Sequence, residues 1–249
     1  MKDWVEPVTD DELARLVVVS PHFDDAVMGA GYLLAAHPGS TVVTVMAGPP
    51  TRYPEPVSEW DALGGFVSGD DVVALRRVED AAALAVLDAT PVWLDFVDHQ
   101  YGEPSDVDAV AAALIDTLRA LDPTAVCVPF GLANPDHDCV HRAARIAMDE
   151  LPAPSWFAYE DAGYSNLPGL LAWRVRGLLA AGRWPTPAII GLSDDRARKQ
   201  RALECYRSQL GPLRADHRLD ERLVAGLPEQ HWRLRPPPPG WEALADVEG

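Results

Sequence analysis

The residues LVVVSPHFDDAVMGAGYLL, Leu16 to Leu34, join the pattern of a buried strand to a cluster of ionisable groups. The continuous apolar run before the serine is typical of a strand buried on both faces of a parallel sheet, and Asp25–Ala36 has the apolar spacing of a helix. His22, Asp24 and Asp25 stand where the two elements meet. Ligands bind at the carboxyl ends of the strands in open α/β sheets, so this turn is a candidate site. The alternative is that an aspartate merely caps the helix.

The same two patterns alternate along most of the chain. Short runs rich in β-branched or aromatic residues predict strands at Leu16–Ser20, Thr41–Ala47, Pro91–Phe96, Thr124–Val128, Trp156–Tyr159 and Ala188–Leu192. Longer segments with apolar residues three and four positions apart predict helices at Asp25–Ala36, Val72–Leu87, Val107–Leu121 and His137–Glu150. This order implies right-handed crossovers, so we expect an α/β fold of the Rossmann-like type, a three-layer sandwich with a mostly parallel sheet.

Length and composition indicate how the chain is organised. With 249 residues, 48% of them hydrophobic, the chain can bury a sizeable core. We expect one domain over residues 1–249, with a core at about 16–210 and a Pro-rich C-terminal tail at 228–249. Two segments depart from the alternation. Gly48–Asp70 is a loop long enough to cover a site, and Trp173–Pro185 is a locally basic helix and turn.

The charge balance and the apolar runs exclude several classes of partner. The net charge is −17, which would repel nucleic acid and anionic membranes over most of the surface. No apolar run approaches the roughly 20 residues of a membrane span, and Met1–Glu12 lacks the features of a signal peptide, so we expect a cytoplasmic protein. Cys127, Cys139 and Cys205 lack a CxxC spacing, which favours simple packing over disulfides or a zinc site.

A second polar cluster follows the predicted strand Thr124–Val128, in the residues ANPDHDCVHRAA. His137 is expected at the same sheet edge as His22, because the carboxyl ends of parallel strands share one edge. Together with Asp25, these histidines would give zinc three ligands and leave the fourth position open for water, as catalytic zinc sites do. Zinc lowers the pKa of such water to about 7, and Asp24 is placed to act as its general base. The two clusters indicate a metal-assisted hydrolase.

These motifs resemble those of the PIG-L or LmbE-like zinc-dependent deacetylases, which carry P-H-x-D-D after the first strand and H-P-D-H or H-x-D-H after a later one. PHFDD and NPDH are the matching residues here. The stretches VVTVMAGPP, RRVEDAAALAVL, YEDAGYS and YRSQL are also similar to one bacterial branch of the family, so the resemblance covers roughly Leu16–Leu210. It implies the removal of an N-acyl group, with acetyl expected first, from an amino sugar or an amino-sugar-containing metabolite.

The resemblance also assigns roles to individual residues. It implies the following ligands for Zn²⁺, with Fe²⁺ as the alternative in vivo: His22, Asp25 and His137. It implies Asp24 as general base, in agreement with the role argued from the residues. It further implies that Arg76 contacts the substrate and that Asp98 lies close to the site. For Arg76, a surface ion pair with Glu79 explains the spacing equally well.

One position departs from the family's pattern. Asn134 stands where the family has the first histidine of H-x-D-H, which is thought to protonate the leaving amine with help from the aspartate matched by Asp136. Asparagine donates no catalytic proton, but its N–H groups can stabilise a developing oxyanion, a contribution of about 10²- to 10³-fold. The acid would then be another residue. The sequence offers three candidates and does not rank them: His99, His141 and His217.

Three other interpretations compete with the deacetylase. The change at Asn134 leaves open a weak or inactive family member that binds metal and sugar. HDCVH, His137–His141, imitates the helical HExxH of zinc peptidases but leaves PHFDD unexplained. GAG at Gly29–Gly31 lacks the third glycine of a dinucleotide fingerprint, because Leu34 stands in its place, and we exclude that fingerprint.

Overall fold

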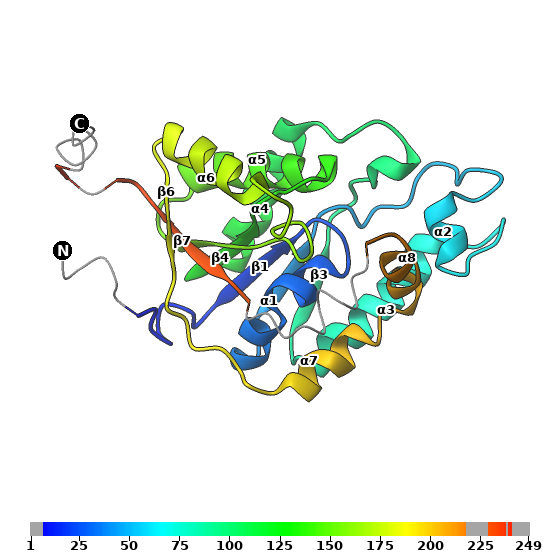
Figure 1. The fold of residues 1–249 in the computed structure, drawn as a ribbon, viewed down its shortest axis with the longest axis horizontal. Helices are drawn as coiled ribbons and strands as arrows, with labels where there is room; N and C mark the ends of the chain where they lie inside the picture. The colour runs from blue at the N-terminus through cyan, green and yellow to red at the C-terminus, as the bar shows by residue number, and fades with distance from the viewer. Residues whose placement is uncertain (1–6, 218–228, 238, 241–249) are drawn as a thin grey trace.

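Seven strands form the central layer of the part of the chain that the structure describes, residues 7–217, 229–237 and 239–240 of a computed structural model (Figure 1). Their order is β3-β2-β1-β4-β5-β7-β6. The bounds are β1 Leu16–Ser20, β2 Thr41–Thr44, β3 Thr90–Trp93, β4 Ala125–Pro129, β5 Ser155–Tyr159, β6 Trp184–Pro187 and β7 His231–Arg235. The pairs among β1 to β5 are parallel, whereas β7 is antiparallel to both β5 and β6. The predicted α/β fold with a mostly parallel sheet is therefore confirmed.

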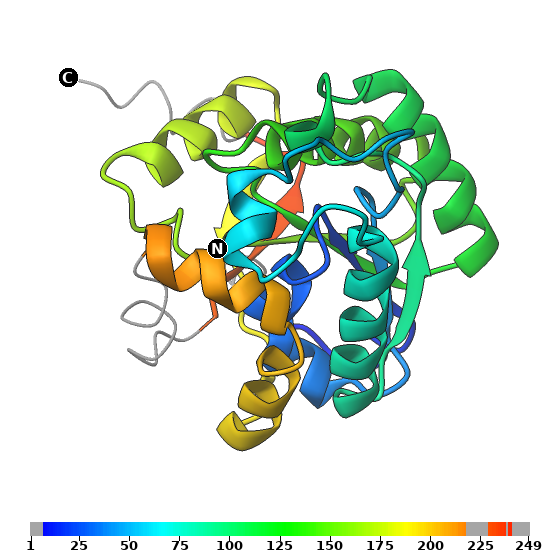
Figure 2. The same ribbon diagram turned by 90° about the vertical axis from the view of Figure 1, so that its right-hand side faces the viewer.

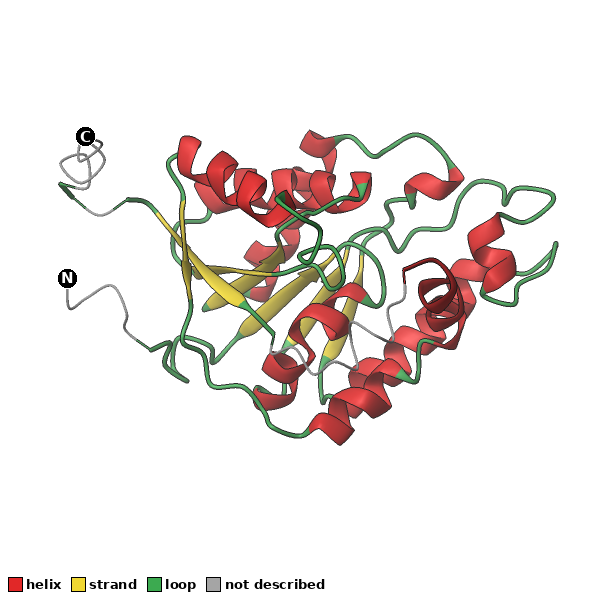
Figure 3. Cartoon of the chain, viewed as in Figure 1, coloured by secondary structure: helices red, strands yellow, loops and turns green. Residues whose placement is uncertain are grey.

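Helices cover both faces of the sheet, which gives the three layers seen in Figure 3. One face carries α1, α3 and α7, and the other carries α4, α5 and α6 (Figure 1). The bounds are α1 Asp25–Ala36, α2 Glu59–Leu63, α3 Val72–Val86, the 3₁₀ helix η2 His99–Tyr101, α4 Val107–Leu121, α5 Pro135–Glu150, α6 Leu170–Ala180, α7 Arg196–Leu203 and α8 Arg207–His217. None of these described helices combines the length and the apolar character needed to cross a membrane.

The side chains of β1 alternate between two hydrophobic cores, one on each face of the sheet. Leu16 and Val18 belong to the core that includes residues of α1 and α3, and Val17 and Val19 belong to the core of α4 and α5. Every residue of the strand is buried. A central strand covered on both faces needs apolar residues at every position, which explains the unbroken run in the sequence.

The sequence prediction and the structure differ most after β5. The predicted strand Ala188–Leu192 is wrong, because the segment that pairs with β7 is β6, directly before it. β6 contains Pro185 and Pro187 and lies at the edge of the sheet, where the missing N–H donors are tolerated. β7, α7 and α8 are absent from the sequence prediction. Half of the predicted tail, 228–249, lies outside the described residues, and the described half contains β7.

Smaller differences concern the bounds of single elements. The strand predicted at Thr41–Ala47 ends at Thr44. The loop predicted at Gly48–Asp70 includes the short helix α2. The basic helix predicted within Trp173–Pro185 begins three residues earlier, at Leu170. By contrast, α1 and α4 have the predicted bounds.

Helix α1 is kinked near its centre and is held there by a buried ion pair. Ala30 has non-helical angles (φ −138°, ψ 21°). Just beyond it, the backbone N–H groups of Tyr32 and Leu33 donate to the carboxylate of Glu229 at 2.6 and 3.2 Å. The ammonium group of Lys199, on α7, lies 2.6 Å from the same carboxylate. The ion pair thus joins α7 and the residues before β7 to the helix that begins at the polar turn.

Helices α2 and α8 lie against each other at the carboxyl end of the sheet (Figure 2). Two glycines allow this close approach. A Cβ atom on Gly64 would lie 2.5 Å from the carbonyl oxygen of Ser208, and one on Gly211 would lie 2.7 Å from that of Leu63. The two helices therefore touch through their backbones and form a wall beside the strand ends.

Candidate active site

The turn after β1 is shaped by hydrogen bonds to Ser20. Its hydroxyl group donates to the carbonyl oxygen of His22 at 2.5 Å and accepts the backbone N–H of Ala26 at 2.9 Å. Asp24 occupies the N-cap position of α1 but makes no side-chain capping hydrogen bond. The carboxylate of Asp25 accepts the backbone N–H of His22 at 2.9 Å. The interpretation of Asp24 as a mere helix cap is therefore wrong.

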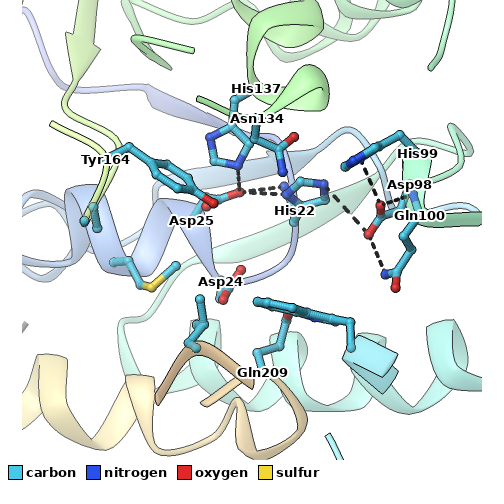
Figure 4. Close-up of a pocket in the computed structure, with 15 residues that line it drawn as sticks. His22, Asp24, Asp25, Asp98, His99, Gln100, Asn134, His137, Tyr164 and Gln209 are labelled. Carbon is cyan, nitrogen blue, oxygen red and sulfur yellow. Dashed lines mark hydrogen bonds and ion pairs between the residues drawn. The ribbon is translucent and has the colours of Figure 1, made fainter. Parts of the chain in front are cut away.

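Three side chains from two neighbouring strand ends converge on one point (Figure 4). Oδ2 of Asp25 lies 3.2 Å from Nδ1 of His22 and 3.2 Å from Nε2 of His137. One potential ligand atom from each of the three residues lies within 4.8 Å of the others. His137 reaches this point from the first turn of α5, because β1 and β4 are adjacent and parallel. The structure thus brings together the three residues predicted to bind metal.

Each of the two imidazoles contacts a buried carboxylate through its other ring nitrogen. Nδ1 of His137 lies 2.6 Å from Oδ1 of Asp161, and Nε2 of His22 lies 3.0 Å from Oδ2 of Asp136. Carboxylates in this position fix the tautomer and the orientation of histidines that bind metals. The second oxygen of each carboxylate is buried without a hydrogen-bond partner among the described residues. This donor set, two nitrogens and one carboxylate with acidic groups behind them, fits a divalent cation.

The acidic surroundings shift the pKa values of the cluster. Burial opposes the protonation of His137, but the carboxylates of Asp25 and Asp161 outweigh it and raise its pKa to about 9. For Asp24, burial and then repulsion from Asp25 raise the pKa to about 7. The pKa of Asp25 is lowered despite its burial, chiefly by His137. The negative charge of these carboxylates keeps protons on the histidines, and it also attracts a metal cation that can replace those protons.

A cavity of about 270 Å³ opens onto this cluster. His22, Asp24 and His137 line it, together with residues from several other parts of the chain. Trp60 comes from α2, Tyr164 from the segment after β5, and Gln209 and Leu213 from α8. The ring of Tyr164 packs edge-on against His137, with centroids 5.7 Å apart. The predicted loop Gly48–Asp70 and the segment that follows β5 therefore both contribute wall residues.

The remaining predicted residues on this side of the sheet lie at or behind the cavity. Asn134 lines it and caps α5, since its Oδ1 accepts the backbone N–H of Asp136 at 2.8 Å. Asp98 lines the cavity with its Oδ2 3.9 Å from Nε2 of His22. Asp136 is fully buried, and its Oδ2 also lies 2.9 Å from Nδ1 of His99. Their catalytic and binding roles remain predictions.

Arg76 does not line this cavity. Its buried guanidinium donates to Asp61 at 2.9 Å and lies 3.4 Å from the hydroxyl oxygen of Tyr101. The alternative of a surface pair with Glu79 is wrong, because Arg76 is buried and Glu79 accepts hydrogen bonds from Ser208. A direct contact between Arg76 and substrate stays a prediction.

The three histidines considered as proton donors have different surroundings. His99 lines the cavity. His141 is buried, and its ring contacts the carbonyl oxygen of Pro129 at 3.0 Å instead of joining either potential metal cluster. Burial lowers its pKa to about 4. The zinc-peptidase interpretation, which needs His137 and His141 on one metal, therefore lacks support. The side chain of His217 lies outside the part of the structure that is described.

One residue of the site, Asp161, was not predicted. It is the second residue after β5, in the YEDAGYS stretch, and is 2% exposed. The sequence could have indicated it, because it is an acidic residue just past the carboxyl end of a predicted parallel strand. The same rule identifies His22 and His137. A second group of potential ligands was also unforeseen, with one atom from each residue within 4.8 Å of the others: His22, Asp98, His99 and Asp136.

Comparisons with known proteins agree with this geometry. The family model described as PIG-L: GlcNAc-PI de-N-acetylase matches residues 17–148. A solved triple mutant of a deacetylase involved in the teicoplanin biosynthetic pathway is 27% identical, with a TM-score of 0.72 over 91% of this chain and 100% of the other. The pseudoaglycone deacetylase Dbv21 is 25% identical, with a TM-score of 0.72 over 90% and 98%.

A more distant structure shares the fold alone. The N,N'-diacetylchitobiose deacetylase from Pyrococcus horikoshii is 18% identical, with a TM-score of 0.53 over 91% of this chain and 85% of the other. No match is found among the curated proteins.

Proposed function

The chain belongs to the PIG-L family of de-N-acetylases, and we propose from this premise that it is a metal-dependent hydrolase that removes an N-acetyl group from an amino sugar of a small glycoconjugate. The observation that carries the proposal is the convergence of His22, Asp25 and His137 at a cavity that Asp24 also lines. Similarity to the teicoplanin-pathway deacetylase and to Dbv21 supports it.

The metal would be held by Nδ1 of His22, the carboxylate of Asp25 and Nε2 of His137. We propose Zn²⁺, with Fe²⁺ as the alternative. A bound divalent ion polarises a carbonyl oxygen and lowers the pKa of water. Asp136 and Asp161 hold the two imidazoles in place through their other ring nitrogens.

The protein's own groups would handle the protons and the developing charge. Asp24 takes a proton from the attacking water, because it lines the cavity beside the metal ligands and is not used as a helix cap. Asn134 offers an N–H group to the carbonyl oxygen as negative charge develops there, since its own oxygen is already held by the backbone of Asp136. The products are acetate and a free amine.

The cavity favours a single sugar residue. Its volume of about 270 Å³ lies just below the range of about 300–1,000 Å³ typical of sites for drug-sized ligands. The aromatic walls, Trp60 and Tyr164, offer flat apolar surfaces, and Gln209 offers hydrogen bonds. We therefore expect one N-acetylated sugar to enter while the rest of the glycoconjugate stays outside.

The proposal is tested first by metal content. Protein purified without added metal is analysed by elemental mass spectrometry, with His137→Ala as the test variant and His141→Ala as the matched control on the same helix. We expect about one zinc or iron per chain, lost in the first variant and retained in the second. If the wild type binds no metal even after zinc is supplied, the hydrolase mechanism fails.

Amine release is measured next on N-acetylglucosamine, N,N'-diacetylchitobiose and an N-acetylglucosaminyl glycopeptide. We expect release from at least one of them by the metal-loaded wild type and none by His137→Ala. Metal-loaded protein that binds these compounds without cleaving any would favour the inactive, binding member of the family.

A further inference from the structure

Cleavage of an amide needs a proton donor as well as a base. When the C–N bond breaks, the electron pair stays on nitrogen, and an amine leaves readily only if that nitrogen receives a proton. Asn134 has no proton of suitable acidity. The ionisable groups that line the cavity outside the three metal ligands are Asp24, Asp98, His99 and Tyr164.

We propose that His99 is the proton donor to the leaving amine, a role that rests on the proposed function. Its ring lines the same cavity as Asp24 and the three predicted metal ligands, and its side chain is 33% exposed. His99 lies in η2, which follows β3, whereas Asn134 caps α5, which follows β4. The two residues therefore reach the cavity from the ends of different strands.

The carboxylate of Asp136 fixes this ring beside a metal ligand. Its Oδ2 accepts the backbone N–H of His99 at 3.0 Å and lies 2.9 Å from Nδ1 of the same residue. The same oxygen lies 3.0 Å from Nε2 of His22. The rings of His99 and His22 are therefore both held beside one buried carboxylate oxygen.

The other nitrogen of the His99 ring is available for the substrate. Nε2 makes no hydrogen bond to any residue in the described ranges. The carboxylate of Asp98, 3.5 Å from Nδ1, raises the pKa of His99, with burial acting against the rise and Asp136 adding to it. An imidazolium that donates Nδ1–H to Asp136 thus presents Nε2–H to the cavity.

The step is balanced in atoms and charge. Water adds its oxygen to the carbonyl carbon and gives one proton to Asp24. The C–N bond then breaks, and the nitrogen takes its electron pair and the proton from Nε2 of His99. Solvent exchange moves the proton from Asp24 back to His99, which restores both groups. The second proton of the water leaves the carboxyl group for the amine or for solvent, and acetate and the amine are released.

Two substrates separate proton donation from a general loss of activity. N,N'-diacetylchitobiose, or whichever N-acetyl sugar the wild type cleaves, has an amine leaving group that needs a proton. 4-Nitrophenyl acetate has a phenolate leaving group that departs without one. The test variant is His99→Asn, because its side-chain N–H can still donate to Asp136 in place of Nδ1. His99→Gln is the second variant, in case the first unfolds.

We expect amide turnover to fall by about 10²- to 10⁴-fold, the usual contribution of general acid catalysis, while ester turnover changes by less than about 3-fold. Metal content stays at the wild-type value. The double variant His99→Asn, Asn134→His has a new proton donor at position 134. We expect its amide turnover to be about tenfold or more above that of His99→Asn. Tyr164→Phe is measured on both substrates beside these variants, because the Tyr164 hydroxyl is another ionisable group that lines the cavity.

Four results would overturn the role of His99. Unchanged amide turnover would mean that Asp24 returns the proton itself. Equal losses on both substrates would mean that His99 only positions His22. An amide-selective loss in Tyr164→Phe but not in His99→Asn would move the role to Tyr164. A second metal ion, lost with His99, would make it a ligand in the group with Asp98 and Asp136. Wild-type protein that cleaves neither substrate would instead overturn the proposed function, and His99 with it.

Discussion

Two groups of buried charges flank helix α1, and they differ in how completely their atoms are paired. At the kink, Lys199 contacts Glu229 at 2.6 Å and the carbonyl oxygen of Met28 at 2.8 Å, and its ammonium faces the ring of Tyr32 at 4.6 Å. Glu229 in turn accepts two backbone N–H groups of the helix. This pair is closed, because each charge has several partners.

The group at the start of the helix is open. Carboxylates outnumber cations around His22 and His137, and one oxygen each of Asp136 and Asp161 is buried with no partner in the part of the chain that the structure describes. A buried charge without compensation costs free energy. A closed pair already compensates its charges, whereas an open group gains free energy when it binds a cation or a proton. Burial of charge alone therefore does not identify a site, and incomplete pairing is the better sign.

The largest difference between the two groups is expected from Asp24→Asn. The change removes the proposed base, so amide turnover should fall by about 10²- to 10⁴-fold. The free energy of unfolding should stay the same or rise, because burial and Asp25 already disfavour the charged form of Asp24. Acetate release and urea unfolding of the metal-free protein measure the two effects. Turnover within tenfold of the wild type would remove Asp24 from the mechanism.

The closed pair should respond in the opposite way to Lys199→Met. Removing one partner leaves Glu229 charged and buried, and breaking such a pair costs about 3–5 kcal/mol in the free energy of unfolding. Metal content of the folded protein should not change. The double variant with Glu229→Gln should lose less than Lys199→Met alone, because it removes the uncompensated charge and keeps an acceptor for the backbone of α1. Loss of metal with no loss of stability would reverse the comparison.

The sequence predicts the open group far better than the closed one, because only the open group stands at the ends of strands that the sequence predicts. His22, Asp25 and His137 each follow a short, strongly apolar strand, so the rule that parallel strands share a carboxyl edge brings them together. Lys199 and Glu229 carry no such signal, because they lie in α7 and just before β7, two elements that the sequence prediction does not contain.

The errors in the fold have the same cause. β6 contains two prolines and β7 reads HWRLR, so neither resembles a parallel core strand, and their antiparallel pairing depends on partners far away in the sequence. The sequence does not rank His99 above His141 and His217 as the proton donor for a similar reason. Nothing in the sequence indicates that η2 brings it to Asp136 of α5.

A smaller effect within the open group is expected from Asp161→Asn. The amide keeps the size of the side chain but weakens the hold on Nδ1 of His137, and such changes behind a metal ligand cost about 10- to 100-fold in metal affinity. Asp138→Asn is the matched control, because Asp138 lies next to His137 on α5 but pairs with Arg174. Competition with a chelator measures both. Equal affinity in the two variants would show that Asp161 does not support the site.

The smallest effect tests a buried polar group that belongs to neither set. Nε2 of His141 is buried and has no partner within the described ranges, yet the residue is neutral, since burial lowers its pKa to about 4 from 6.5. The unfolded chain therefore binds more protons between these values, and stability falls as the pH falls through this window. Between about pH 7.5 and pH 5.5, the wild type should lose on the order of 1 kcal/mol more than His141→Leu. Parallel curves from urea unfolding at both pH values would contradict this assignment.

The close contact of α2 and α8 bears on how such a chain can change over evolutionary time. The residues proposed to bind metal stand beside β1 and β4, whose positions the whole sheet determines. Trp60, Gln209 and Leu213 come instead from two helices that meet through Gly64 and Gly211. Substitutions in those helices can alter which sugar is admitted without disturbing the strand ends. A lineage with this architecture can diversify its substrates while inheriting one chemistry.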